Sequence, residues 1–215
     1  MKQYLVPIIR RELLLLLYNI NLIVLSIISA LVTFFIFFIV LDKQMFANSS
    51  LLYSLILITT ILTITLSDYL SIADDYSNGI MEQLFLLPIK PVYILLIKLL
   101  LGLFKYLIIH TALWYILWTN IATEPFLSFF FINYLIFIIY LISVSMFVKT
   151  ISLSTNGNVL QNLLLILLIF PQLILSILSI QEPLYLLLQL SLTILMLPLF
   201  ILFSTIIMQR TIQDS

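Results

Sequence analysis

The residues best suited to chemistry gather in one short polar segment of an otherwise apolar chain. Residues 74–88 have the sequence DDYSNGIMEQLFLLP. Ser77, Asn78 and Gly79 form a turn that can start a helix, and Glu82 then falls in its first turn, where the helix dipole favours a negative charge. We expect a short helix that Pro88 and Pro91 end.

The apolar residues of this segment predict an amphipathic helix. Glu82 and Gln83 fall on its polar side. The apolar side carries Ile80, Met81, Leu84, Phe85 and Leu87. Two interpretations stand: the helix receives movement from a separate nucleotide-binding subunit, or it is an interfacial helix that only turns the chain around.

No catalytic or metal site can be assembled from the remaining residues. The chain has one His, no Cys and only scattered carboxylates, so a nucleophile, a base and an orienting group cannot be brought together. Its three glycines, Gly79, Gly102 and Gly157, cannot form a Walker A loop. We therefore expect no enzyme activity, and any ATP chemistry must reside on a partner subunit.

One face of the third apolar stretch carries a histidine and two tryptophans. His110, Trp114 and Trp118 recur every four residues, which places them along the same side of a helix. Such a face can contact haem through the imidazole and the indole rings. The alternative is that the tryptophans belong to the aromatic belt of a membrane interface and that His110 bonds a neighbouring helix.

Two charged residues lie within apolar stretches and are candidates for an intramembrane ion pair. Asp68 and Lys105 lie at similar distances from the inner ends of their predicted spans, so their depths can match. The alternative is that each side chain extends to the nearby interface.

The composition requires a membrane. Of 215 residues, 64% are hydrophobic and 8% charged, and the formal net charge of zero offers no field for nucleic acid. Stretches of about 20 apolar residues cross a bilayer as helices. We expect an all-α integral membrane fold, a single permease domain over residues 1–215, with a surface segment at 1–19 and six spans near 20–41, 51–73, 99–118, 126–148, 159–180 and 184–208.

Lys and Arg set the expected orientation, because short cytoplasmic loops retain them. With the N-terminus inside, the outer loops hold only Lys43. The inner segments hold Lys2, Arg10, Arg11, Lys90, Lys98, Lys149 and Arg210. Both termini and the 74–91 segment should then face the cytoplasm. A polar inner loop is expected at 149–162, either as a plain turn or as a second contact with an ATPase.

The sequence resembles one known family over essentially its whole length. The most specific part of the resemblance is the 74–88 segment, with its DD, G, EQL and LLP motifs after the second of six predicted spans. The Arg-Arg-Glu sequence at residues 10–12 also fits. On these residues the chain resembles the haem exporter protein B family, CcmB, of the cytochrome c maturation system. The fold implied is ABC-2-like.

The resemblance implies a permease that pairs with a soluble ATPase, CcmA, and works beside the haem-handling proteins CcmC and CcmD. In that family ATP hydrolysis is linked to release of the haem-loaded chaperone CcmE, and direct transport of haem is disputed. The resemblance therefore implies either haem export or chaperone release, with ATP bound by the partner. Two copies with two ATPase subunits are expected in the inner membrane of a bacterium, or of a mitochondrion if the gene is organellar. The implied ATPase-coupling residues are Asp74, Asp75, Gly79, Glu82, Gln83 and Pro88.

Two other functions stay open at this level. An ABC-2 permease for lipid or polysaccharide and a non-transporting scaffold for haem-handling proteins both present apolar helix surfaces. The sequence alone does not separate them.

Overall fold

The computed structural model describes residues 2–18, 20–40, 49–66, 72–121, 127–155 and 158–214. Every regular element in these ranges is an α-helix, as the composition predicts. The described helices are α1 (Lys2–Tyr18), α2 (Ile20–Val40), α3 (Ser49–Leu66), α4 (Ile72–Ser77), α5 (Ile80–Phe85), α6 (Pro91–Ile121), α7 (Leu127–Thr155), α8 (Asn158–Leu178) and α9 (Leu184–Asp214).

Four of these helices are long and apolar enough to cross a membrane, among the residues that the structure describes. Shorter apolar stretches lie in α2 and α3. The four long stretches are Pro91–Ile108, Phe129–Thr155, Gln161–Leu178 and Leu184–Gln213. Helix length and composition are thus typical of a multi-pass membrane protein, and the all-helical membrane fold is confirmed at that level.

Two helix bounds next to the α4–α5 segment differ from the predicted spans. α6 begins at Pro91, before the predicted residue 99, because proline is well tolerated in the first turn of a helix. The predicted second span reached residue 73, but Ile72 already belongs to α4. Pro171 and Pro198 lie inside α8 and α9 without ending them, as predicted.

The polar loop predicted at 149–162 is mostly helix. α7 continues to Thr155 and α8 begins at Asn158. The hydroxyls of Ser154 and Thr155 donate to the carbonyl oxygen of Ile151, which lets these polar residues remain helical. The predicted boundary fell at the first polar residues, whereas the described helix continues to Thr155.

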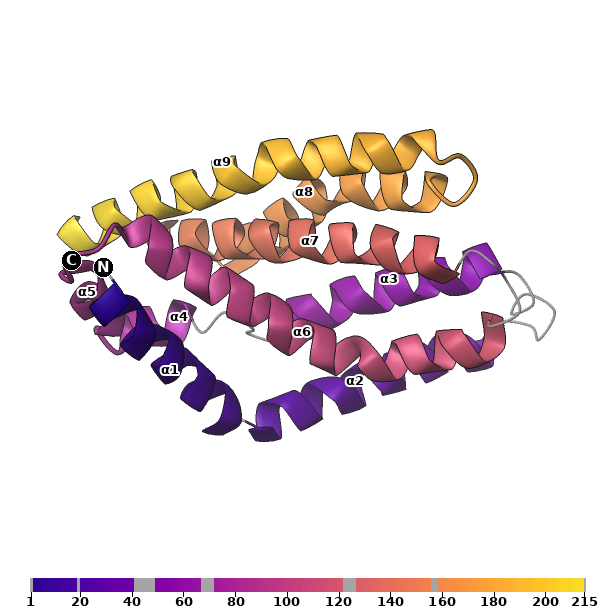
Figure 1. The fold of residues 1–215 in the computed structure, drawn as a ribbon, viewed down its shortest axis with the longest axis horizontal. Coiled ribbons are helices and arrows are strands. Elements are labelled where there is room, and N and C mark those ends of the chain that lie inside the picture. Colours follow the sequence, from indigo (N-terminus) through magenta and orange to yellow (C-terminus); the bar gives the residue numbers. More distant parts are fainter. Residues whose placement is uncertain are drawn as a thin grey trace.

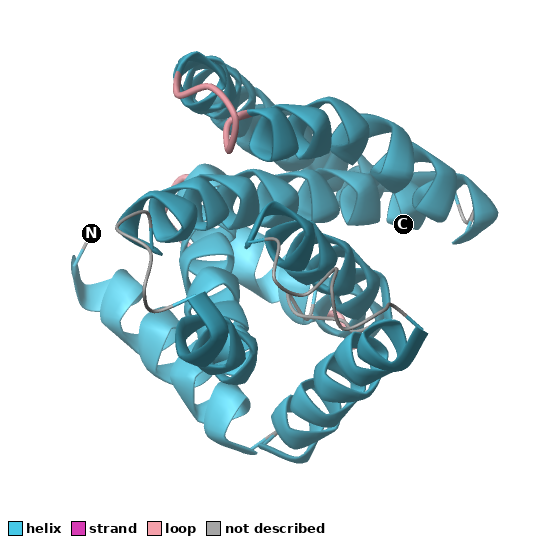
Figure 2. Cartoon of the chain, turned by 90° about the vertical axis from the view of Figure 1, so that its right-hand side faces the viewer, coloured by secondary structure: helices cyan, strands magenta, loops and turns pink. Residues whose placement is uncertain are grey.

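α7 is the central helix of the bundle. Its apolar stretch is 67% buried, against 22% for the corresponding stretches of α8 and α9. The α8–α9 hairpin covers one side of α7 along its length, while α2, α3 and α6 form the other side (Figure 1). Figure 2, viewed from the end with the α8–α9 loop, shows that the described residues form helices joined by a few short loops.

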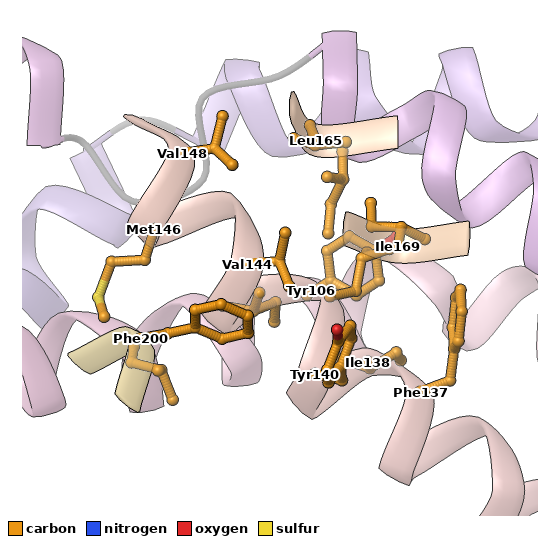
Figure 3. Close-up of a cluster of buried hydrophobic side chains, with 14 of the residues drawn as sticks. Tyr106, Phe137, Ile138, Tyr140, Val144, Met146, Val148, Leu165, Ile169 and Phe200 are labelled. Carbon is orange, nitrogen blue, oxygen red and sulfur yellow. The ribbon is translucent and has the colours of Figure 1, made fainter. Parts of the chain in front are cut away.

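The core consists of interlocking aromatic and aliphatic side chains from α6, α7, α8 and α9. Figure 3 shows Val144 of α7 and Phe200 of α9 within this cluster, with Leu165 and Ile169 contributed by α8. The ring centroids of Tyr140 and Phe200 lie 5.9 Å apart in an edge arrangement. This core fixes the helices that carry the candidate sites.

The two ends of the bundle differ in what they carry. The beginning of α1, the end of α9 and the short helices α4 and α5 are all at the same end of the bundle (Figure 1). The α8–α9 loop lies at the opposite end. We call these the α4–α5 end and the hairpin end.

Candidate functional site

The turn between α4 and α5 depends on one glycine. Gly79 has φ 67°, in the left-handed region that side chains with a Cβ rarely adopt. The N–H of Gly79 donates to the carbonyl of Tyr76 at 3.0 Å, and that of Asn78 donates to the carbonyl of Asp74 at 3.1 Å. The Ser-Asn-Gly turn predicted from the sequence is therefore present, but a short helix also precedes it.

α5 is the amphipathic helix that the sequence predicts. Met81 and Leu84 are buried against the bundle, whereas Glu82 and Gln83 are exposed on the outer face. Burial of two apolar side chains holds α5 in place, because a helix of this length is not stable alone. The exposed polar face remains open to contact at the α4–α5 end.

Four charged side chains meet where α4 lies against α1 and α6. Arg11 Nη2 is 2.5 Å from Asp75 Oδ1, and Arg11 Nη1 is 2.6 Å from Glu12 Oε1. Lys98 Nζ is 3.0 Å from the same Glu12 oxygen and also pairs with Asp75 Oδ2. We call Arg11, Glu12, Asp75 and Lys98 the ion cluster; it ties α4 to α1 and α6.

The ion cluster is neutral and nearly closed to solvent. Its two cations and two carboxylates balance, and the side chain of Lys98 is 1% exposed. Arg11 is the most exposed member, at 29%. Burial by itself raises the pKa of Asp75, but the hydrogen bonds and charges of Arg11 and Lys98 outweigh it and hold that pKa below its usual value.

The predicted coupling residues divide into two groups. Asp74, Glu82, Gln83 and Pro88 are exposed at the α4–α5 end. Asp75 instead points inward, 3% exposed, and belongs to the ion cluster. Its side chain is therefore a structural anchor of α4.

Sequence reasoning did not foresee the ion cluster. Glu12 lies 86 positions from Lys98, and Arg11 lies 64 positions from Asp75, so no local pattern pairs them. The available signal was the balance of charges at the edges of apolar stretches, since a buried charge requires a partner.

His110 lies deep in the bundle. Its side chain is fully buried and its ring stacks on Tyr106 with centroids 4.1 Å apart. Nδ1 is 3.2 Å from the carbonyl oxygen of Tyr106, one turn earlier in α6, and Nε2 has no hydrogen-bond partner among the described residues. The side chains of Trp114 and Trp118 lie outside the described part, so haem contact at His110, Trp114 and Trp118 stays a prediction.

The proposed intramembrane ion pair falls partly outside the description. Asp68 is among residues 67–71, which the structure does not describe. Lys105 is half-buried on α6. Their pairing stays a prediction.

A second polar cluster, without charges, joins α7, α8 and α9 near the hairpin end. Asn133 Nδ2 donates to the carbonyl of Ser176 at 2.8 Å and to Ser179 Oγ at 2.5 Å, and Ser176 Oγ donates to Asn133 Oδ1 at 2.8 Å. Gln189 Nε2 donates to the carbonyl of Asn133 at 3.3 Å, and Gln172 Nε2 donates to Thr193 Oγ1 at 3.0 Å. We call Asn133, Gln172, Ser176, Ser179, Gln189 and Thr193 the amide network.

The amide network leaves two acceptors unused. Within the described residues, the Oε1 atoms of Gln172 and Gln189 are buried and have no hydrogen-bond partner. Interhelical hydrogen bonds of this kind join helices where the hydrophobic effect cannot. The network therefore fastens the α8–α9 hairpin to the central helix.

Comparison with known proteins adds no relative. No family model, no curated protein and no solved structure matches the chain. Groups of His, Cys, Asp and Glu suited to a metal ion are also absent from the described residues.

Proposed function

We propose that this chain is the permease subunit of an ABC-type exporter complex in cytochrome c maturation. In this role it couples ATP hydrolysis on a partner subunit to export of haem or to release of the haem-loaded chaperone. The observation that carries the proposal is the α4–α5 element: a short amphipathic helix after a glycine turn, with Glu82 and Gln83 outward, at the end of the bundle where α1 begins and α9 ends.

The ion cluster supports a mechanical role for that element. A helix that passes movement to the membrane must be joined to the spanning helices more firmly than by one apolar contact. Asp75 anchors α4 to Arg11 of α1 and Lys98 of α6 through hydrogen-bonded ion pairs. A push on α5 would thus reach α6, a long apolar helix, directly.

We infer six spans, formed by α2, α3, α6, α7, α8 and α9, with both termini in the cytoplasm. Figure 1 supports this because the beginning of α1 and the end of α9 lie at the end of the bundle that carries α4 and α5. The excess of Lys and Arg in the same segments fits the positive-inside rule. α1, with Arg10 and several apolar side chains exposed, suits the membrane surface.

Within this proposal the residues take distinct roles. Asp74, Glu82 and Gln83 face the ATPase, Gly79 sets the angle between α4 and α5, and Asp75 holds α4. The partners are CcmA for ATP hydrolysis and CcmC, CcmD and CcmE for haem handling, with two copies of the ATPase subunit. The chain itself supplies no ATP site.

The test is charge reversal on the outer face of α5. Glu82→Lys and Asp74→Lys should leave the protein in the membrane but reduce co-purification of the ATPase and the yield of cytochrome c. A like charge placed in a docked contact can cost several kcal/mol of binding free energy. We expect each charge reversal to weaken binding of the ATPase by about that amount. Gln213→Lys, on the exposed end of α9, is the matched control and should change neither.

Normal association and normal yield in the α5 variants would remove the coupling role and leave an interfacial helix. Identification of the subunits bound to the wild-type chain decides between substrates: sugar- or lipid-handling partners would contradict the haem assignment. Bound haem proteins without any ATPase would favour a scaffold.

The orientation has its own test. Reporter fusions after Ser215 and within residues 41–48 should report opposite compartments, with the C-terminal fusion cytoplasmic. The same compartment at both sites would overturn the six-span arrangement.

A further inference from the structure

One apolar side chain stands out at the α4–α5 end. Leu86, the residue after α5, is 85% exposed, while its neighbours Leu84 and Ile89 are buried. Keeping a leucine in water forgoes about 1.5–3 kcal/mol of burial energy. A single exposed leucine is ordinary on a protein surface, but the backbone and the charges around Leu86 set it apart.

The backbone holds Leu86 in this outward position. Its N–H donates to the carbonyl of Glu82 at 3.1 Å, so it continues the helical turn directly beneath Glu82. The N–H of Leu87 then donates to the carbonyl of Leu84 at 3.3 Å, and Ile89 turns back into the core. Because hydrogen bonds fix both sides, exposure of Leu86 is a property of the fold and not of a frayed end.

Charge separates Leu86 from the other exposed apolar surface at the same end. On α1, Val6 and Leu14 are exposed together with Arg10, a combination that suits anionic lipid headgroups. Leu86 instead lies one turn from Glu82, an acid that such headgroups repel. The surface made by Glu82, Gln83 and Leu86 therefore fits a protein better than a bilayer.

We propose that Leu86 is the apolar anchor of the docking surface, and that it enters an apolar pocket on the cytoplasmic partner bordered by a basic group that pairs with Glu82. The assignment rests on the proposed function, since that partner is the ATPase. Apolar anchors surrounded by polar residues carry most of the energy in many interfaces. Glu82 sets orientation and Leu86 holds the contact.

The absence of cysteine from the sequence gives a direct probe. Leu86→Cys places a single thiol at the anchor, to be labelled with a membrane-impermeant maleimide in inside-out vesicles. Without the ATPase this thiol should label as fully as Asn78→Cys, which lies exposed in the α4–α5 turn. Leu167→Cys, 61% exposed in the middle of α8, should remain unlabelled in lipid.

Adding the ATPase that co-purifies with the wild-type chain should reduce labelling of Leu86→Cys by about tenfold or more. Leu86→Ser should lower retention of that ATPase by about tenfold as well, whereas Leu167→Ser should not. Should Leu86→Ser fail to accumulate, the protection measurement decides alone.

The outcomes separate the anchor from the proposed function. Equal retention by Leu86→Ser and wild type, or no protection of Leu86→Cys, overturns the anchor and leaves the exporter proposal intact. Failure of Leu86→Cys to label in bare vesicles, like Leu167→Cys, shows that lipid covers it and also overturns the anchor. A wild-type chain that binds no ATPase removes both.

Discussion

The ion cluster and the amide network both hold three helices together, but they do so with different chemical groups. Each joins three helices through buried polar side chains, yet the ion cluster uses four full charges and the amide network uses none. The ion cluster lies at the α4–α5 end, where Arg11 still reaches solvent. The amide network lies within the stretches long enough to span a membrane, except for Ser179, which directly follows the stretch of α8.

This difference follows from the cost of desolvation. Taking a charge out of water costs several kcal/mol, and ion pairs offset that cost only when the geometry satisfies every member. Neutral amides cost less, so the amide network can leave Gln172 Oε1 and Gln189 Oε1 unused. The comparison predicts that the ion cluster tolerates little change and that the amide network tolerates more.

The largest effect should come from removing one cation of the ion cluster. Lys98→Met nearly keeps the length of the side chain but leaves Glu12 and Asp75 with Arg11 as their remaining cation among the described residues, which should cost about 3–5 kcal/mol. The melting temperature in detergent and the amount of protein in the membrane measure this. Lys98→Arg, which keeps the charge, should retain part of the stability; an unchanged melting temperature for Lys98→Met would contradict a structural role for the ion cluster.

The second largest effect should come from acid, which protonates the Asp75 carboxylate and so removes one of the four charges of the ion cluster. Because the pKa of Asp75 is lowered in the folded protein, its contribution to stability is complete above the ordinary carboxyl value of 3.8 and is lost as pH falls through the lowered pKa. The melting temperatures of wild type and Asp75→Asn should converge as the pH falls from about 4 to about 2. A constant difference over that range would show that the Asp75 carboxylate contributes nothing.

A smaller loss should follow from removing the centre of the amide network. Asn133→Leu has similar volume but deletes the bonds to Ser176 and Ser179, at a cost of about 1–2 kcal/mol. Its melting temperature should fall less than that of Lys98→Met. A loss as large as that of the lysine variant would erase the distinction between the two clusters.

The smallest effect should come from Gln189→Met. This change deletes one long hydrogen bond at 3.3 Å and also removes a buried acceptor with no partner, two terms that oppose each other. The net change should lie within about 0.5–1 kcal/mol of zero. A loss equal to that of Asn133→Leu would indicate that Gln189 Oε1 receives a hydrogen bond from buried water.

The sequence predicted the elements that depend on local pattern. The apolar stretches overlap α2, α3, α6, α7, α8 and α9, and the turn residues located the start of α5 at Gly79. These signals act over a few residues, where periodicity and backbone preference decide the structure. Local polarity misled once, because the residues after 148 are polar but remain in α7.

The arrangement of side chains between helices could not be predicted in the same way. Asp75 was assigned with Asp74 to a partner-facing surface, yet adjacent residues of a helix point about 100° apart, and only the position of α1 and α6 decides which one is buried. Likewise, Asn133 and Ser176 are 43 positions apart in the sequence. Such contacts depend on how helices stand next to one another, which a single sequence does not state.

The ion cluster also imposes an order on biogenesis. Arg11 and Glu12 leave the ribosome early, but the other two members, Asp75 and Lys98, follow 64 and 86 positions later. Until α6 has been synthesised and inserted, the N-terminal helix lacks its docking partners and must wait at the membrane surface. Early truncation products should therefore expose this helix to proteases, and chains that extend beyond α6 should protect it.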